Sequence, residues 1–243
     1  MQLRDRVALV TGAGRRVGRA LATALGGQGM RVAVHYHASD DEARETAQMI
    51  GDAGGTATLI AGDLADAAIP RRIVADVVRE LGGLDVLVNS AAIMVRTPFE
   101  SVTPAEWDAM FALNLRAPFF LAQAAAPHLR AARGAIVNMA DLAAFESWPA
   151  YIPHGTSKAG VVYLTRALAR TLAPDVRVNG IAPGPVLLPE SWTEDDAARL
   201  LKTTPLQRLG SPADVAGAML YLLHADHVTG ETVIVDGGRH VRT

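Results

Sequence analysis

The sequence predicts an α/β fold in which one doubly wound parallel sheet is covered by helices on both faces. Short apolar runs rich in valine and isoleucine alternate along the chain with segments whose apolar residues recur at helical spacing. Such alternation favours a parallel sheet. The 243 residues are half hydrophobic and contain no linker, low-complexity tract or internal repeat. We therefore expect a single domain over residues 1–243.

The first half of the chain contains four predicted strands. A strand at 6–10 leads through a glycine-rich turn into a helix that ends at Gly26 and Gly27, because consecutive glycines disfavour a helix. The elements that follow are a strand at 30–36, a polar helix at 40–52, a strand at 57–61, a helix at 69–81 and a strand at 84–89.

The second half contains a long helical stretch and three more predicted strands. Residues 104–129 have helical spacing, and Pro118 is expected to bend or divide this helix. The segment 185–204 has no clear hydrophobic period. We therefore expect a mobile loop that can include a short helix and that covers a substrate. The other elements are a strand at 135–139, a helix from about 155 to 173, a strand at 177–181, a helix at 214–223 and a strand at 231–235.

Composition excludes several classes of function. A formal net charge of −2, a pI near 6.4 and the lack of a basic tract give no reason to expect nucleic acid or a membrane surface as partner. The absence of cysteine excludes disulfides, thiolate metal sites and thiol nucleophiles. No histidine pair has metal-ligand spacing beside an acid, so we assign no metal. With no secretory signal or long apolar segment, we expect a cytoplasmic protein that acts on a small molecule.

The glycine-rich turn from Thr11 to Gly18 predicts a dinucleotide site. A turn between a first strand and its helix presents free backbone N–H groups and the positive end of the helix dipole to a phosphate. Sites for NAD usually end the second strand with an acid that binds the ribose 2′-hydroxyl. Here that strand ends in HYHAS, without an acid before Asp40, and Arg15 and Arg16 add positive charge. We therefore predict NADP(H) as the cofactor.

Three chemically active residues are expected to meet after the fifth strand. Asp141 follows the apolar run 135–139, at the end of a strand where α/β sheets place active sites. His154 and Lys158 are four residues apart, which places them on one face if the segment from Gly155 onward is helical. Pro153 is expected to bar a regular helix through the residues before that point.

These motifs resemble the short-chain dehydrogenase/reductase family over essentially the whole chain. The resemblance implies a Rossmann-type fold with a seven-stranded sheet, a nicotinamide cofactor, hydride transfer, and a homotetramer or dimer built on the long helices. It rests on the Thr11–Gly18 turn, Asp63-Leu64, Asn89-Ser90-Ala91, Asn114, Lys158, Pro183-Gly184 and Asp236-Gly237-Gly238.

The resemblance also implies the site residues. The candidate catalytic residues are Asp141, His154, Lys158 and Asn114. The candidate residues for the cofactor are Gly12, Arg15, Arg16, Val17, Gly18, His37, Ser39, Asp63, Leu64, Asn89, Ser90, Ala91, Lys158, Pro183, Gly184 and Val186. The candidate residues for the substrate are Arg16, Met94, Tyr151 and Trp192.

Within the family, the chain is most similar to the pteridine and dihydromonapterin reductases, which use NADPH to reduce C=N bonds. Arg16 replaces the usual second glycine, residues 35–39 have the pattern HYH-x-S, and Asp141 replaces the usual active-site serine. The chain departs from that branch where His154 occupies the position of the family's tyrosine proton donor. A second departure is Ala92 and Met94, where the branch has a serine and an aromatic residue.

This combination favours hydride transfer to a C=N bond in a pterin-like heterocycle or cyclic imine. A carboxylate at position 141 attracts a protonated iminium, and His154 is a donor or water-positioning residue that titrates near neutrality. Lys158 is expected to hold the nicotinamide ribose, and Asn114 a structural water. Two alternatives remain open: a carbonyl reductase in which His154 protonates an alkoxide, and an NADP(H)-binding protein without turnover.

Overall fold

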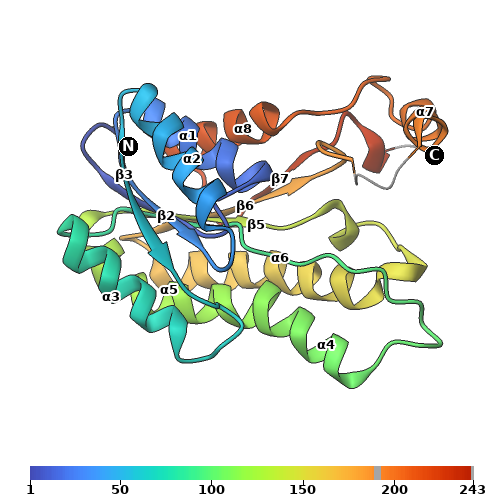
Figure 1. Ribbon diagram of the computed structural model, residues 1–243, viewed down its shortest axis with the longest axis horizontal. Helices are drawn as coiled ribbons and strands as arrows, with labels where there is room; N and C mark the ends of the chain where they lie inside the picture. The colour runs from blue at the N-terminus through green and yellow to red at the C-terminus, as the bar shows by residue number, and fades with distance from the viewer. Residues whose placement is uncertain (189–192, 242–243) are drawn as a thin grey trace.

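Seven strands form one parallel sheet in the order β3-β2-β1-β4-β5-β6-β7, which confirms the predicted fold class. The computed structural model describes residues 1–188 and 193–241 (Figure 1). The strands are β1 (Val7–Val10), β2 (Arg31–Tyr36), β3 (Thr56–Ala61), β4 (Val86–Asn89), β5 (Ala135–Met139), β6 (Arg177–Pro183) and β7 (Thr232–Val235).

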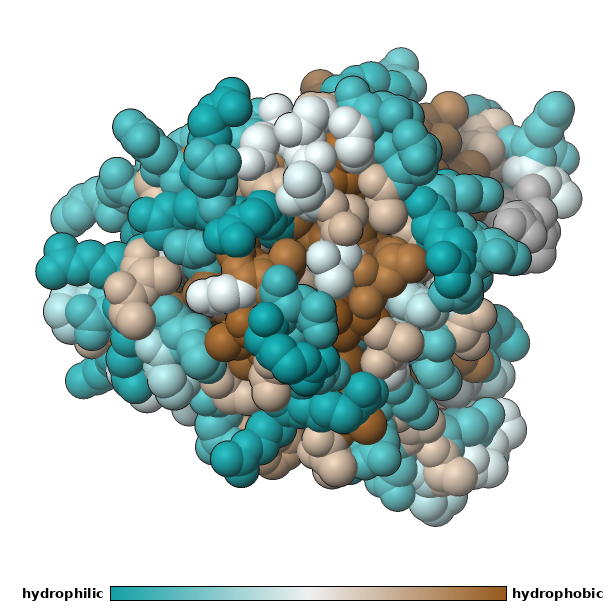
Figure 2. All heavy atoms as spheres, turned by 60° about the vertical axis from the view of Figure 1, so that its left-hand side comes forward, coloured by the Kyte–Doolittle hydropathy of each residue, from teal (hydrophilic) through white to brown (hydrophobic). Residues whose placement is uncertain are grey.

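Helices cover both faces of the sheet and create two apolar layers (Figure 1). On one face pack α1 (Arg16–Gly27), α2 (Asp40–Asp52) and α8 (Pro212–His224). On the other pack α3 (Ile69–Leu81), α5 (Ala117–Ala132) and α6 (Ile152–Leu172). Seen from the side, hydrophobic residues gather in the middle of the face and hydrophilic residues surround them (Figure 2). Within the described ranges, none of the helices combines the length and apolar character needed to span a bilayer.

The predicted long helix is interrupted earlier than expected. Helix α4 (Pro104–Phe111) leads into a π-helical turn at Ala112–Arg116, and α5 follows directly. Pro118 lies in the first turn of α5 and does not itself divide the helix. Its ring would clash with the carbonyl of Asn114 in a regular α-helix, and the wider π turn removes that conflict.

Helix α6 begins before Pro153, so the prediction that Pro153 bars a regular helix there was wrong. Pro153 lies in the first turn, where a backbone N–H has no partner within the helix and its loss costs nothing. His154 therefore belongs to the first turn of α6, and its side chain shares a helix face with that of Lys158.

The predicted substrate segment contains one regular element. Helix α7 (Glu194–Lys202) starts with a capping box, in which Thr193 and Asp196 bond each other's backbone N–H groups. Residues 189–192 lie outside the described part of the chain.

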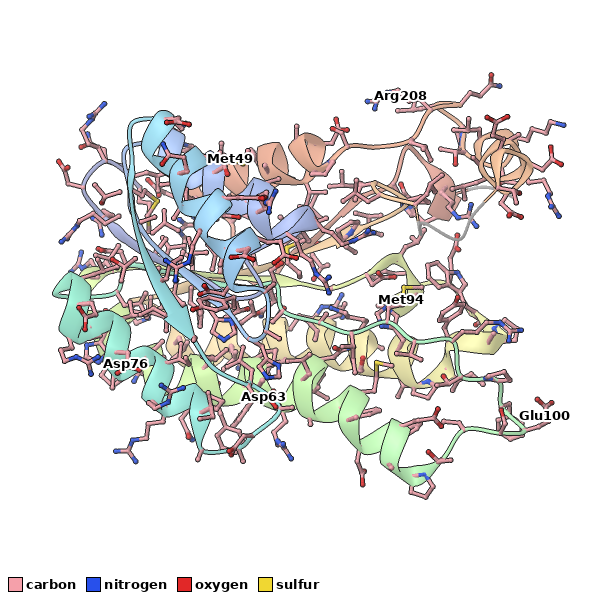
Figure 3. The ribbon with its side chains drawn as sticks, in the orientation of Figure 1. Met49, Asp63, Asp76, Met94, Glu100 and Arg208 are labelled. Atoms are coloured by element: carbon pink, nitrogen blue, oxygen red, sulfur yellow. The ribbon has the colours of Figure 1, made fainter. Side chains whose placement is uncertain are left out.

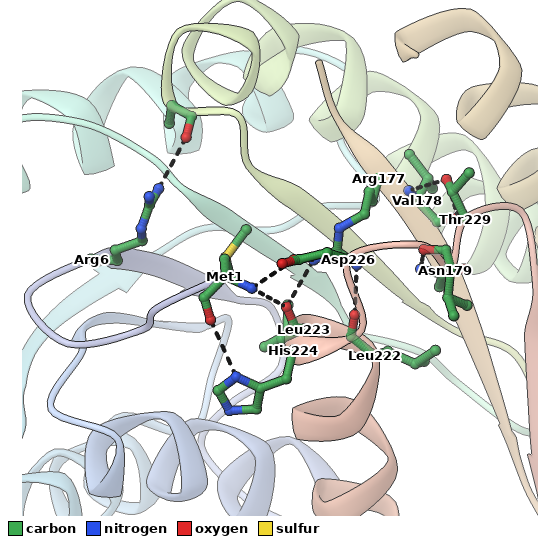
Figure 4. Close-up of polar contacts among 12 residues, drawn as sticks. Met1, Arg6, Arg177, Val178, Asn179, Leu222, Leu223, His224, Asp226 and Thr229 are labelled. Atoms are coloured by element: carbon green, nitrogen blue, oxygen red, sulfur yellow. Dashed lines mark hydrogen bonds and ion pairs between the residues drawn. The ribbon is translucent and has the colours of Figure 1, made fainter. Parts of the chain in front are cut away.

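The carboxyl end of α8 is held by cations (Figure 4). The guanidinium of Arg177, at the start of β6, donates to the carbonyls of Leu222 at 2.6 Å and Leu223 at 2.8 Å. The amino group of Met1 also donates to the Leu223 carbonyl, at 3.1 Å. The last carbonyls of a helix lack partners within the helix and carry a partial negative charge, so these bonds stabilise α8 on the sheet.

Replacement of Arg177 by methionine should lower the free energy of unfolding by about 2 kcal/mol, because two carbonyls lose a charged donor. Arg208→Met is the matched control, since Arg208 is exposed and its ion pair with Asp214 spans 3.5 Å. We expect that control to change stability by less than about 0.5 kcal/mol. Urea unfolding measures both, and equal effects of the two substitutions would contradict the role of Arg177.

Candidate active site

The candidate active site lies at the edge of the sheet where the parallel strands end. Strand β1 lies between β2 and β4, so the chain turns to one side after β1 and to the other after β4. Open α/β sheets bind their ligands at such a reversal.

The loops that follow β1 and β4 are locked together by the hydroxyl of Thr11. Its oxygen accepts the N–H groups of Ser90 at 2.9 Å and Ala91 at 3.0 Å. It also donates to the carbonyl of Val88 at 3.3 Å. Two of the loops expected to carry the cofactor therefore have a fixed relative position.

Two glycines of the predicted phosphate loop leave no room for a side chain. Gly12 has a φ of +64°, and a Cβ there would lie 2.9 Å from the Cα of Ala91. A Cβ on Gly18 would overlap the carbonyl oxygen of Gly12. Val17, another predicted cofactor residue, lies in the first turn of α1. The close contacts at Gly12 and Gly18 require glycine at both positions, as the tight turn before a nucleotide-binding helix does.

Arg16 connects the phosphate loop to the predicted substrate segment. Its φ of +53° is uncommon for a residue with a side chain. Its Nη2 atom donates to the carbonyl of Leu187 at 3.2 Å. Arg16 and its neighbour Arg15 are both exposed at the start of α1, where positive charge is unfavourable without an anion.

His37 and Ser39, two of the predicted cofactor residues, follow the end of β2. Ser39 is the N-cap of α2, but its side chain makes no capping bond. The Nδ1 atom of His37 lies 3.9 Å from a carboxylate oxygen of Asp63. Asp40 is bonded by the Tyr36 hydroxyl at 2.6 Å and by Arg44 at 2.8 Å. These two bonds, that of Tyr36 first, lower the pKa of Asp40 and hold its carboxylate within α2.

Lys158 is buried beneath the site and points to the end of β5. Its Nζ atom donates to the carbonyl of Met139 at 2.7 Å. Burial lowers the pKa of Lys158 from its usual 10.5 to about 8, although the carboxylate of Asp141 acts in the opposite direction. An ammonium has three donors, so two remain for a ribose or a water.

Asn114 clamps the loop that follows β4. Its side-chain oxygen accepts the N–H of Ile93, and its side-chain nitrogen donates to the carbonyl of the same residue, both at 2.9 Å. The nitrogen also lies 3.1 Å from the hydroxyl of Ser157. The side chain of Asn114 is therefore engaged by protein groups. The expected water remains a prediction and would use the backbone carbonyl, to which Pro118 offers no N–H.

His154 and Asp141 face each other across the site. The Nδ1 atom of His154 lies 3.2 Å from the carbonyl of Ile93, and the imidazole is buried. Its Nε2 atom is 3.6 Å from Oδ2 of Asp141 and has no hydrogen-bond partner among the described residues. The other oxygen of Asp141 accepts the N–H of Ala143 at 2.8 Å. The structure thus brings the predicted acid, imidazole and ammonium together.

The other residues predicted to contact the cofactor or the substrate lie in several different elements. The amide of Asn89 points into the sheet and donates to Asn138 at 2.8 Å, and Leu64 is buried. Met94 is half exposed on the loop that runs above α6 (Figure 3). Tyr151 lies in a separate 3₁₀ turn before α6, with its ring edge-to-face to Trp148. Pro183, Gly184 and Val186 lie at and after the end of β6, and Trp192 is outside the described residues.

Sequence reasoning missed three residues that support the site. Ser157 donates to the carbonyl of His154 at 2.7 Å and accepts from Asn114. The hydroxyl of Thr11 joins two loops. His35 contacts the phosphate loop through its imidazole. The position of Ser157 three residues after His154 on a helix was a usable signal, whereas the contacts of Thr11 and His35 depend on strand pairing.

Substitution of Gly18 by alanine should weaken NADPH binding at least tenfold, because the new Cβ forces the Gly12 carbonyl to move. Gly27→Ala is the matched control: its Cβ would meet nothing closer than 4.0 Å, and alanine suits a helix. Titration of nicotinamide fluorescence measures both affinities. Unchanged binding by the Gly18 variant would contradict the assignment of this turn.

The buried ammonium of Lys158 should make stability depend on pH. The unfolded chain binds one proton more than the folded chain between the folded pKa of about 8 and the usual 10.5, so the free energy of unfolding rises with pH in this window. Relative to Lys158→Met, the wild type should gain up to about 3 kcal/mol there. Urea unfolding of both proteins at several pH values measures the gain, and a constant difference would contradict the burial of this charge.

Known proteins resemble the chain over nearly its full length. Residues 12–240 match a family model described as enoyl-(acyl carrier protein) reductase. The 3-oxoacyl-(acyl-carrier-protein) reductase FabG of Staphylococcus aureus is 34% identical over 240 residues, which cover 96% of this chain and 98% of the relative.

Solved structures agree with this relationship. A mutant short-chain dehydrogenase/reductase of Serratia marcescens has a TM-score of 0.93 and 32% identity, covering 99% of this chain and 100% of its own. A blue fluorescent protein from a metagenomic library, in complex with NADPH, has a TM-score of 0.91 and 31% identity, covering 98% and 99%. The chain therefore belongs to the short-chain dehydrogenase/reductase family of oxidoreductases.

Proposed function

We propose that this protein is an NADPH-dependent reductase in which His154 and Asp141 supply the proton that accompanies hydride transfer. One observation supports this role most directly. The Nδ1 atom of His154 faces the carbonyl of Ile93, so Nδ1 carries a hydrogen and donates it. In the neutral imidazole, Nε2 is then a proton acceptor, and it faces the carboxylate of Asp141 at 3.6 Å.

Two acceptors at this distance repel each other unless a proton lies on one of them. Protonation of Nε2 turns the repulsion into an ion pair. In that state the pair holds one transferable proton. Its net charge is then zero, and the proton lies at the position where the family resemblance places a tyrosine hydroxyl.

This chain's residues complete the reduction around that proton. The reduced nicotinamide supplies the hydride when it is bound. Lys158 holds the ribose and keeps positive charge beside the pair, and Asn114 fixes the loop that sets the orientation of His154. His154 passes its proton to the substrate atom that gains electrons. A carbonyl substrate, the hydride and this proton together give an alcohol.

A carbonyl is the acceptor that the neutral pair fits best. Developing alkoxide charge needs a proton donor nearby, and a protonated His154 is one. The Staphylococcus relative is named as a 3-oxoacyl reductase, and this similarity favours the same class of reaction.

Reduction of a C=N bond, in a pterin-like heterocycle or cyclic imine, is the second candidate. The observation that favours it is the carboxylate of Asp141 at the site, where many relatives are expected to have serine. A protonated iminium is attracted to that carboxylate. In this case the pair stays anionic during hydride transfer, and His154 is a positioning residue.

The remaining alternative is an NADP(H)-binding protein without turnover. Binding of NADPH that no ketone or imine oxidises would favour it.

The preference for NADP(H) is supported by the charges around the expected ribose. Exposed Arg15 and Arg16, with His37 and Ser39, present donors to a 2′-phosphate. The carboxylate of Asp40 already binds Tyr36 and Arg44, and no other acid lies among residues 36–40. The segment 185–204, with Arg16, Met94, Tyr151 and Trp192, would contact the small-molecule substrate.

The exposed aromatic residues of α5 and α6 support self-association. Phe119, Phe120 and Tyr163 expose between 38% and 75% of their surface. Large exposed apolar side chains on neighbouring helices mark an interaction surface. We propose that a second copy covers them, in the homotetramer or dimer that the family resemblance implies.

Replacement of His154 by phenylalanine should lower kcat at least a hundredfold, since the ring remains but the proton donor is lost. The Kd for NADPH should stay within threefold, because His154 touches none of the loops expected to bind the nucleotide phosphates. NADPH oxidation is followed at neutral pH with a panel of ketones and cyclic imines. A phenylalanine variant as active as the wild type would exclude His154 as the donor.

Asp141→Asn separates the two acceptor classes. The asparagine amide donates to Nε2 and removes the need for a stored proton, so turnover should fall at least tenfold, about 1.4 kcal/mol of barrier. The loss should be larger for a ketone than for an imine if Asp141 stabilises the protonated His154. It should be larger for an imine if Asp141 attracts a protonated iminium. Turnover within twofold of the wild type would contradict both roles of Asp141.

A further inference from the structure

A buried histidine joins the two ends of the nucleotide site. His35 is the penultimate residue of β2, which lies between β1 and β3 in the sheet. Its imidazole is 2% exposed. The N–H of Gly12, in the phosphate loop after β1, donates to Nδ1 at 3.2 Å. Nε2 lies 3.0 Å from the carbonyl of Gly62, in the turn after β3.

These two contacts select one state of the imidazole. Gly12 brings a donor to Nδ1, and Gly62 brings an acceptor to Nε2, so the ring is neutral with its hydrogen on Nε2. In an imidazolium, Nδ1 would also carry a hydrogen, and it would face the N–H of Gly12 as a second donor. Two backbone hydrogen bonds join the same segments. The N–H of Ala13 donates to the carbonyl of His35, and the N–H of Gly62 donates to the carbonyl of Tyr36, both at 2.9 Å.

The surroundings keep this ring uncharged. Burial is the largest cause that lowers the pKa of His35, to about 4. His37 and Arg72 act in the same direction, while the Gly62 carbonyl and the Asp63 carboxylate oppose them. Gly12 itself is enclosed, since Ala91 and Gly18 pack on its other sides. The imidazole is therefore a rigid polar contact for Gly12.

We propose that His35 is a positioning residue that holds the phosphate loop at a fixed separation from the Gly62–Leu64 turn. We place the pyrophosphate at the first of these, which is the predicted phosphate loop. We place the adenosine end at the second, because Asp63 is a candidate cofactor residue and lies beside His37, which is expected near the ribose. A dinucleotide must contact both at once, so its affinity depends on that separation. A fragment that contacts only the adenosine end does not depend on it. The inference rests on nucleotide binding at this edge and not on the identity of the substrate.

The test compares NADPH with adenosine, which contains none of the cofactor's phosphates. His35→Phe keeps a ring but loses both bonds, and should weaken NADPH binding at least tenfold while adenosine binding changes by less than threefold. His35→Asn can still accept from Gly12 and should recover part of the loss. His227→Phe is the control, because His227 is exposed before β7, at the opposite edge of the sheet. Equal loss for the two ligands, or no loss, would overturn the proposal.

A measurement on the unaltered protein avoids any dependence on how the variants fold. The amide cross-peak of Gly12 is followed by NMR from pH 8 to pH 5 without cofactor. It should not move with a histidine titration, because the acceptor on His35 stays neutral. A transition centred near 6.5, the usual pKa of histidine, would show that the Gly12 contact is not the one proposed.

Discussion

The backbone of Ile93 is the group on which the candidate active site depends. Asn114 binds both its N–H and its carbonyl, so the loop after β4 has one position. The same carbonyl faces Nδ1 of His154 and thereby decides which nitrogen of that ring points to Asp141. A single clamped residue thus sets the tautomer and the orientation of the proposed proton donor. Asn114, whose side-chain amide makes this clamp, lies within the π turn.

The cofactor side depends on a similar kind of constraint. The hydroxyl of Thr11 joins the loops after β1 and β4, and the imidazole of His35 joins the loop after β1 to the turn after β3. Each contact links neighbouring strands at their carboxyl ends. Because these strands are buried and parallel, their ends cannot move independently, and short polar side chains there control the loops that meet the ligand.

The sequence predicted the succession of strands and helices along the chain, the glycine turn and the meeting of Asp141, His154 and Lys158, because hydrophobic period and motif spacing are local signals. It did not predict the π turn, since a wider helical turn has no distinct period, and it misjudged Pro153, which is harmless in a first turn. The contacts of Asn114 with Ile93 and of His35 with Gly12 and Gly62 join residues distant in sequence. These contacts can be identified only once the pairing of the strands is known.

The hydrogen that the Ile93 carbonyl places on Nδ1 of His154 is tested most directly by ¹⁵N NMR of the imidazole nitrogens, with the signals of His154 assigned by comparison with the phenylalanine variant. We predict that Nδ1 carries hydrogen in the wild type, which leaves Nε2 to face Asp141 and the substrate. A neutral ring with hydrogen on Nε2 alone would contradict the proposed orientation of the proton donor.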